Sequence, residues 1–155
     1  MAINKKIHPL QLAPNYIAIL PAGLIAAAVS APILNNLNYP DGEGLYRILA
    51  NICHQDFFRS FSISGHPCGL CARCLGGYSG MLAGLLIVNL QKTLQIIRML
   101  LLYCIGSTAL LFAILDALVK FGDSNVYRFV SGSVGGFGFG LMLMVGTTFY
   151  LLRKK

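Results

Sequence analysis

Charged residues are scarce in this sequence. Only 11% of its 155 residues are charged and only five are acidic, whereas a soluble domain carries about 25% charged residues. Hydrophobic residues make up 56%, and the mean hydropathy is +0.70. These values exclude a soluble globule, a disordered chain and a secreted disulfide scaffold. They favour a protein that lies in a membrane.

Familiar catalytic patterns are also missing. The sequence has no apparent Ser-His-Asp set, no glycine loop that would hold a phosphate, and no paired carboxylates. The five cysteines and three histidines are therefore the residues most able to carry chemistry.

Four apolar runs indicate the fold: about 16–34, 75–91, 99–119 and 129–152. Each is close to the ~20 residues that cross a bilayer as a helix, and backbone groups in lipid must be paired within the segment. We expect an all-α integral membrane protein with four transmembrane helices, forming a single membrane domain over 1–155. A cleaved signal peptide is the alternative for the first run, since 28–31 resembles a cleavage site. Pro32 and the three later runs favour a retained helix.

The net charge of +7 would suggest nucleic acid in a soluble protein, but here the charges flank apolar runs and report orientation. One side has seven basic residues and no acid: Lys5, Lys6, Lys92, Arg98, Arg153, Lys154 and Lys155. The other side mixes Arg47, Arg59, Arg73, Lys120 and Arg128 with Asp41, Glu43, Asp56 and Asp123. Because basic residues prefer the cytoplasm, we predict a plasma-membrane protein with cytoplasmic termini and an extracytoplasmic 35–74 connection. We expect no nucleic-acid partner.

Glycines recur every fourth residue in two of the runs. The series are Gly76, Gly80, Gly84 and Gly132, Gly136, Gly140. Residues four apart share one helix face, and glycine there lets another backbone approach. Internal packing of a four-helix bundle is the simpler explanation. Docking of a partner protein or a flat cofactor is the other.

The 35–74 connection begins with an amphipathic pattern. Leu45, Ile48, Leu49 and Ile52 follow the spacing of one helix face. We predict a short amphipathic interfacial helix over about 45–55, lying on the membrane surface or against the bundle.

Four of the five cysteines follow closely. Cys53 precedes Cys68, Cys71 and Cys74, which are spaced C-x-x-C-x-x-C. Cys-x-x-Cys lets two sulfurs meet one tetrahedral metal, and Cys53 with His54 or Cys68 would complete a zinc site. An iron–sulfur cluster is less favoured, because the usual fourth cysteine followed by proline is missing.

The same cysteines suit other chemistry. Cys71 and Cys74 begin a predicted helix, whose dipole lowers a thiol pKa, and Arg73 lies between them. Quinone-linked thiol oxidoreductases place such a pair at the mouth of a four-helix bundle, which makes this an analogy of architecture only. A structural disulfide is the third alternative.

Asp116 is the one charged residue inside the apolar runs. An ionisable group at that depth is costly and usually paired. We expect a salt bridge to Arg59, Arg73 or Arg128, with a proton or ion relay as the alternative.

A larger pattern carries a family resemblance: Cys53-His54-Gln55, Arg59-Ser60-Phe61, Gly65, Cys71-Ala72-Arg73-Cys74-x-Gly76-x-Tyr78-x-Gly80, Asp116 and Arg128-x-x-x-Gly132. This resembles an uncharacterised prokaryotic integral-membrane family, known as a domain of unknown function (family 2085). The resemblance implies a small multi-pass membrane protein without an assigned activity. It also implies that Cys68 stands outside the shared polar set, which favours Cys53, Cys71 and Cys74 with a histidine.

The sequence thus predicts a metal site, with zinc as the metal, at the membrane edge. Its expected ligands are Cys53, His54, Cys71 and Cys74, with Cys68 and His66 as substitutes. The supporting polar residues are Gln55, Arg59, Arg73, Asp116 and Arg128. The predicted role is a structural or accessory subunit of a larger membrane complex, with the bilayer and other membrane subunits as partners. A quinone-linked thiol-disulfide oxidoreductase using Cys71 and Cys74 is the alternative.

Overall fold

The computed structural model describes residues 13–90, 96–119 and 122–153, and most of them are helical. The helices are α1 (Ala13–Asn36), α2 (Asp41–Ala50), α3 (Ala72–Leu90), α4 (Ile96–Val119) and α5 (Asn125–Arg153), with a 3-10 turn, η1, at Phe57–Arg59. The two strands are β1 (Ser62–Ile63) and β2 (His66–Pro67), which pair antiparallel. The prediction of a mostly helical chain is confirmed.

Three helices are long and apolar enough to cross a bilayer. Their qualifying segments are Tyr16–Asn36, Leu100–Val119 and Asn125–Thr147. The apolar part of α3, Ala72–Ile87, is shorter than that criterion. Three candidate spans are therefore established by length and composition, and the fourth stays a prediction.

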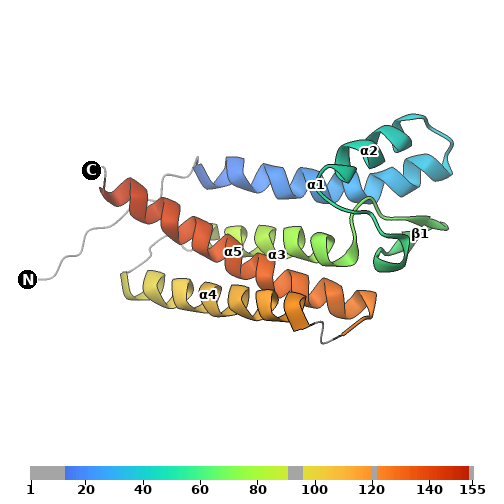
Figure 1. Cartoon of the computed structure of the whole chain (residues 1–155). Coiled ribbons are helices and arrows are strands. Elements are labelled where there is room, and N and C mark those ends of the chain that lie inside the picture. Colours follow the sequence, from blue (N-terminus) through green and yellow to red (C-terminus); the bar gives the residue numbers. More distant parts are fainter. Residues whose placement is uncertain (1–12, 91–95, 120–121, 154–155) are drawn as a thin grey trace, which may run out of the picture.

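The four long helices lie beside one another and alternate in direction along the chain (Figure 1). α2 and the β1–β2 hairpin gather at one end of this bundle, where α1 ends and α3 begins. α1 begins and α5 ends at the opposite end. Every cysteine of the 35–74 connection thus lies toward a single end of the molecule.

α3 and α5 run parallel and touch backbone to backbone. A Cβ on Gly76 or Gly80 would overlap the carbonyl oxygen of Phe129 or Ser133. From the other side, a Cβ on Gly136 would overlap the carbonyl oxygen of Gly77. Both glycine series therefore serve internal packing, as the simpler explanation predicted.

α2 ends earlier than the predicted 45–55 helix, at Ala50. The Asn51 side chain donates through Nδ2 to the carbonyl oxygens of Arg47 and Ile48, at 3.2 and 3.1 Å. Asparagine competes in this way with the helical backbone pattern and favours helix ends. Cys53 still follows the buried face of α2, because its N–H donates to the Leu49 carbonyl oxygen at 3.0 Å and its side chain is buried in one cluster with Leu49 and Leu70. His54 lies beyond the helix and is exposed.

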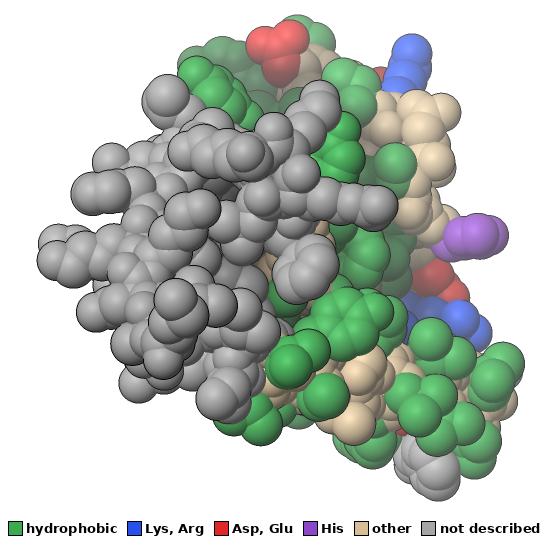
Figure 2. Space-filling model, turned by 90° about the vertical axis from the view of Figure 1, so that its left-hand side faces the viewer, with side chains coloured by type: hydrophobic (Ala, Val, Ile, Leu, Met, Phe, Trp, Pro, Cys, Tyr) green, Lys and Arg blue, Asp and Glu red, His purple; other side chains and the backbone are tan. Residues whose placement is uncertain are grey.

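The surface is rich in apolar side chains. Several large ones on α4 are exposed, including Leu101, Leu111, Phe112 and Leu118. Figure 2 views the end of the bundle where α1 begins and α5 ends, and its described side chains are mostly hydrophobic. The exposed apolar side chains along α4 fit contact with lipid rather than water.

Most of the basic residues used to predict orientation fall outside the description. Lys5, Lys6, Lys92, Lys120, Lys154 and Lys155 lie outside the described residues. Arg98 and Arg153 belong to α4 and α5, but their side chains are not described.

Candidate metal centre

Gln55 fastens the end of α2 to the cysteine-bearing loop. Its backbone is left-handed, with φ of 50°, which turns the chain back after Cys53. Its side-chain Nε2 donates to the carbonyl oxygens of Tyr46, at 2.7 Å, and Gly69, at 3.0 Å. Gln55 therefore joins two segments that are 23 positions apart in the sequence (from 46 to 69). This is a structural task for the Gln of the Cys53-His54-Gln55 motif.

The β1–β2 hairpin aims the chain at Cys68. Its two-residue turn is Ser64-Gly65, and both have positive φ, 51° and 83°. This is the geometry of the tight hairpin turns that match strand twist. Directly afterwards, the Cys68 N–H donates to the Phe61 carbonyl oxygen at 2.7 Å.

The loop then docks on α1 at a place prepared by a proline. Pro32 has no N–H, so the carbonyl of Ala28, four residues earlier, has no helical donor. The Gly69 N–H fills that role at 3.0 Å. A Cβ on Gly69 would lie 2.5 Å from Leu49 Cδ1 and 3.3 Å from the Ala28 Cα. Proline in α1 and glycine in the loop together hold the cysteine segment against the bundle.

Three cysteine sulfurs meet at this point. The Sγ atoms of Cys53, Cys71 and Cys74 all lie within 4.8 Å of one another. Sulfurs that share a tetrahedral zinc, with Zn–S bonds of ~2.3 Å, are about 3.8 Å apart. A small contraction would therefore bring all three into bonding distance of one ion. Cys53 is 6% exposed, and Cys71 and Cys74 are half-buried.

The environment of Cys71 favours its thiolate. The Cys71 N–H donates to Cys53 Sγ at 3.2 Å, which holds the two cysteines side by side. The thiol of Cys74 donates to the sulfur of Cys71, which is the largest cause of a Cys71 pKa lowered to about 5. Burial opposes this shift, while the backbone N–H groups of Cys74 and Arg73 reinforce it. A thiolate at neutral pH is the form that binds metals and attacks disulfides.

The other predicted ligands lie apart from the three sulfurs. His54 is exposed, and His66 pairs with Ile63 in the hairpin. Cys68 is buried, and burial raises the pKa of its thiol. Among the described residues, none of these three joins the group of Cys53, Cys71 and Cys74. All five cysteines are described, and each is a free thiol.

Asp116 is paired within the helices, and its arginine is Arg73. The Asp116 side chain is 0% exposed. Arg73 Nη2 donates to Asp116 Oδ2 at 3.0 Å, and Ser131 Oγ donates to the same oxygen at 2.6 Å. The Tyr127 hydroxyl donates to Oδ1 at 2.6 Å. The expected salt bridge is present, which favours the structural explanation for this carboxylate.

The two remaining arginines pair with other acids. Arg59 Nε lies 3.1 Å from Asp56 Oδ2, and Arg128 Nη2 lies 2.9 Å from Asp123 Oδ1. Both pairs are partly open to solvent, where an ion pair contributes about 0–1 kcal/mol.

Sequence reasoning missed Tyr127 and Ser131 as partners of Asp116. They lie four positions apart at the start of α5, and therefore share one helix face. Asp116 is the only charged residue of the apolar runs, and the next helix carries two hydroxyl residues on one face near its start. This pattern could have identified Tyr127 and Ser131 as its partners. The sequence could also have shown that Pro32, which has no N–H, leaves the Ala28 carbonyl without a helical donor.

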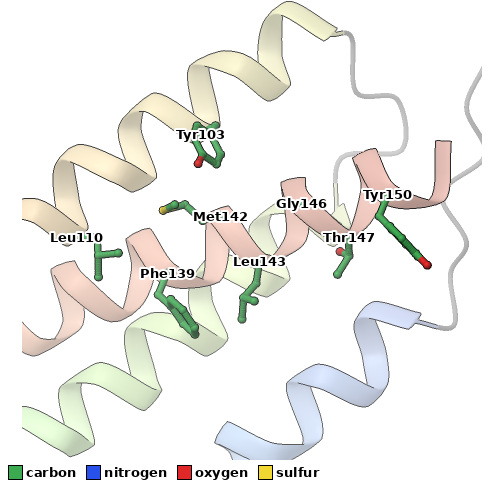
Figure 3. A pocket seen from close by; sticks show the side chains of 8 residues that line it. All are labelled: Tyr103, Leu110, Phe139, Met142, Leu143, Gly146, Thr147 and Tyr150. Atoms are coloured by element: carbon green, nitrogen blue, oxygen red, sulfur yellow. The ribbon is translucent and has the colours of Figure 1, made fainter. Parts of the chain in front are cut away.

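A groove lies farther along the bundle, between α4 and α5 (Figure 3). Its volume is about 570 Å³, and it is lined by Tyr103 and Leu110 of α4 and by residues of α5 such as Phe139, Met142 and Tyr150. In Figure 3, Met142 points toward α4, whereas Phe139 and Tyr150 point away from it. The groove's nearest lining residue on α5, Phe139, follows Gly132, which packs on Arg73, by a helical rise of roughly 10 Å. The groove is therefore separate from the cysteines.

Three apolar helices are long enough to span a bilayer, and three cysteines that could hold a metal ion meet at one end of the bundle. These features define a helical membrane protein with a candidate metal site. The chain belongs to the family described as "Predicted membrane protein (DUF2085)", which matches residues 53–142. The match begins at Cys53 and includes Cys71, Cys74 and Asp116. The family resemblance noted from the motifs is thereby confirmed.

One relative is the uncharacterized protein MJ1492 of Methanocaldococcus jannaschii. It is 33% identical over 102 residues, which are 60% of this chain and 62% of that protein. The chain therefore spans less than two thirds of that relative's length. No solved structure matches the chain.

Proposed function

We propose that Cys53, Cys71 and Cys74 bind one zinc ion that fastens the end of α2 to the start of α3. The observation that carries this proposal is the meeting of three sulfurs within 4.8 Å of one another. Zinc prefers thiolate ligands, and structural zinc sites are usually four-coordinate. His54 is the first choice for the fourth ligand because it neighbours Cys53, with Cys68, His66 or water as substitutes.

We further propose that the protein is a structural or accessory subunit of a larger membrane complex. The metal would stabilise a cap of short elements at one end of the bundle. That cap presents Phe57 and Phe58 at its surface, and Phe58 is 85% exposed. Exposed apolar side chains of this kind suit contact with lipid or with another membrane protein.

In this proposal α3 is a fourth span. Its backbone packs on α5 from Gly76 to Gly84, so it shares the depth of a helix that qualifies as a span. The whole chain, 1–155, then forms one domain of the plasma membrane with both termini in the cytoplasm. The alternating helix directions support a 35–74 connection on the opposite side of the membrane, which the basic residues also favour (Figure 1).

The test is the metal content of the purified full-length protein in detergent, measured by mass spectrometry. We expect about one zinc per chain, and a loss of at least about fivefold in Cys71→Ser/Cys74→Ser. Cys104→Ser is the matched control, because Cys104 is an exposed thiol on α4 outside the sulfur group. Less than about 0.2 metal per chain in wild-type protein with free thiols would contradict the proposal.

A quinone-linked thiol-disulfide oxidoreductase is the second candidate. It is favoured by the lowered pKa of Cys71 and by the hydrogen bond from the Cys74 thiol. The groove between α4 and α5 begins roughly 10 Å beyond Gly132 along α5, which weighs against direct transfer from these thiols to a quinone bound there. Thiol trapping in cells distinguishes the two functions. A redox pair cycles between dithiol and disulfide, whereas a metal site stays reduced and is protected from alkylation until a chelator is added.

A further inference from the structure

Arg73 connects the cysteine cluster to the interior of the bundle. It lies between Cys71 and Cys74 in the sequence, and its backbone N–H is directed at the sulfur of Cys71. Its guanidinium pairs with Asp116 of α4 at 3.0 Å. One residue thus contacts a proposed metal ligand through its backbone and a buried carboxylate through its side chain.

The position of Arg73 is restrained on both of these sides. Asp116 is fully buried and accepts from three donors, so each of its oxygens is occupied. Removing one partner from a buried carboxylate strongly destabilises the folded protein, because the charge is left without compensation. This cost keeps the side chains around Asp116 in one arrangement. On the backbone side, a Cβ on Gly132 would overlap the Arg73 carbonyl oxygen. The turn that carries Cys71 and Cys74 is therefore fixed against both α4 and α5.

We propose that Asp116 is a positioning residue for the metal centre, which it holds in its binding geometry through Arg73. This inference rests on the proposed function, because it concerns the same three sulfurs. Asp116 reaches the metal through Arg73 and the Cys71–Cys74 turn. Groups of this kind, which orient ligands from outside the coordination sphere, typically change metal affinity by about 10–100-fold when they are removed.

The coupling also works in the reverse direction. If Asp116 strengthens metal binding, the metal must strengthen the packing around Asp116 by the same factor. Metal would then stabilise the junction of α3, α4 and α5 in addition to the short elements at the end of the bundle.

The test is the zinc affinity of the full-length protein in detergent, measured by competition with a chromophoric chelator. We expect Asp116→Asn to bind zinc at least about 10-fold more weakly than wild type. The control is Asp123→Asn, which removes the same charge from the ion pair with Arg128 but from an exposed site, 88% open to solvent. We expect that control to keep wild-type affinity.

Cobalt substitution gives a readout that a general loss of stability would not move. The thiolate-to-cobalt absorption reports ligand geometry, so Asp116→Asn should alter it in the fraction that remains folded. Arg73→Lys keeps a positive charge beside Asp116 and should restore part of the affinity that Arg73→Ala loses. If Asp116→Asn does not fold, Tyr127→Phe is the second variant, because it removes one hydrogen bond and leaves the ion pair. It should weaken zinc binding about threefold or more.

The outcomes are distinct. Unchanged zinc affinity and an unchanged cobalt spectrum in Asp116→Asn, or in Tyr127→Phe if only that variant folds, would overturn the positioning role and leave the zinc site standing. An equal loss in Asp123→Asn would overturn it too, since charge alone would then explain the effect. A wild-type protein that binds no zinc would overturn the proposed function, and this inference with it.

Discussion

At the scale of single residues, Cys71 is the most reactive thiol that the geometry indicates. Because its pKa is lowered to about 5, its thiolate is present above that pH and is lost as the pH falls through it. We predict that iodoacetamide labels Cys71 of the chelator-treated, folded protein with a half-maximal rate near pH 5. Peptide mass spectrometry after short pulses at pH 4 to 9 measures this profile.

The same protein in denaturant provides the comparison. An unfolded cysteine titrates near ~8.5, so the profile of Cys71 should move up by several pH units. Cys74→Ala should also raise the midpoint in folded protein, since it removes the side-chain hydrogen bond that is the largest cause of the lowered pKa. A folded-state midpoint near 8.5 would show that Cys71 is an ordinary thiol.

The sequence predicted the reactive residues better than their partners. Cys53, Cys71 and Cys74 were expected together because the C-x-x-C spacing and the start of a helix restrict where sulfurs can lie. The choice among Arg59, Arg73 and Arg128 for Asp116 could not be made from sequence. That choice depends on how α3 and α4 are rotated around α5, which is fixed by backbone contacts between helices.

At the scale of the elements, the contact of α3 with α5 depends on missing side chains. We predict that Gly80→Ala lowers the stability of the folded protein by about 2 kcal/mol or more, because the added Cβ would overlap the Ser133 carbonyl oxygen, a backbone atom that cannot move alone. Thermal unfolding in detergent, followed by circular dichroism, measures the loss.

Gly23→Ala is the matched control for that prediction. Gly23 is also a glycine of a long apolar helix, α1, but a Cβ there meets nothing within 4 Å. Alanine favours a helix over glycine by about 0.5–1 kcal/mol, so this variant should be as stable as wild type or slightly more. Equal losses in both variants would mean that close packing is not the reason.

The long helices were predictable because spanning a bilayer requires apolar length. The runs 16–34, 99–119 and 129–152 became α1, α4 and α5 with ends shifted by a few residues. The hairpin formed by β1 and β2 was not predicted, because two-residue strands leave almost no periodic signal. The parallel pairing of α3 with α5 could not be predicted from the sequence either. A glycine series indicates that another helix packs closely, but it does not identify that helix.

At the scale of the whole molecule, orientation in the membrane remains a prediction that fusion reporters can check. We expect a fluorescent protein fused after Lys155 to fluoresce, and alkaline phosphatase fused there to be inactive. Alkaline phosphatase fused after Gly44, beyond α1, should be active. These results follow if the side with basic residues and no acids faces the cytoplasm.

The two reporters check each other at each position, since one works only inside the cell and the other only outside. The reversed pattern would place the 35–74 connection in the cytoplasm. There, reducing conditions disfavour a structural disulfide, and a zinc site would become the stronger of the remaining explanations. The proposal needs an odd number of spans between Gly44 and Lys155, namely α3, α4 and α5. If the phosphatase were active at both positions, that number would be even, and α3 would not be a span.

The bond between the Gly69 N–H and the Ala28 carbonyl has a consequence for how such chains evolve. Pro32 makes the carbonyl available, and the lack of a side chain at Gly69 allows the loop to reach it. In a homologue with a residue other than proline at position 32, the N–H of that residue would donate to the Ala28 carbonyl. The carbonyl would then no longer be available to the Gly69 N–H, and the loop would lose this contact with α1. Selection would then no longer hold position 69 as glycine. Across many homologues, substitutions at these two positions, 37 residues apart (32 to 69), should therefore be inherited together.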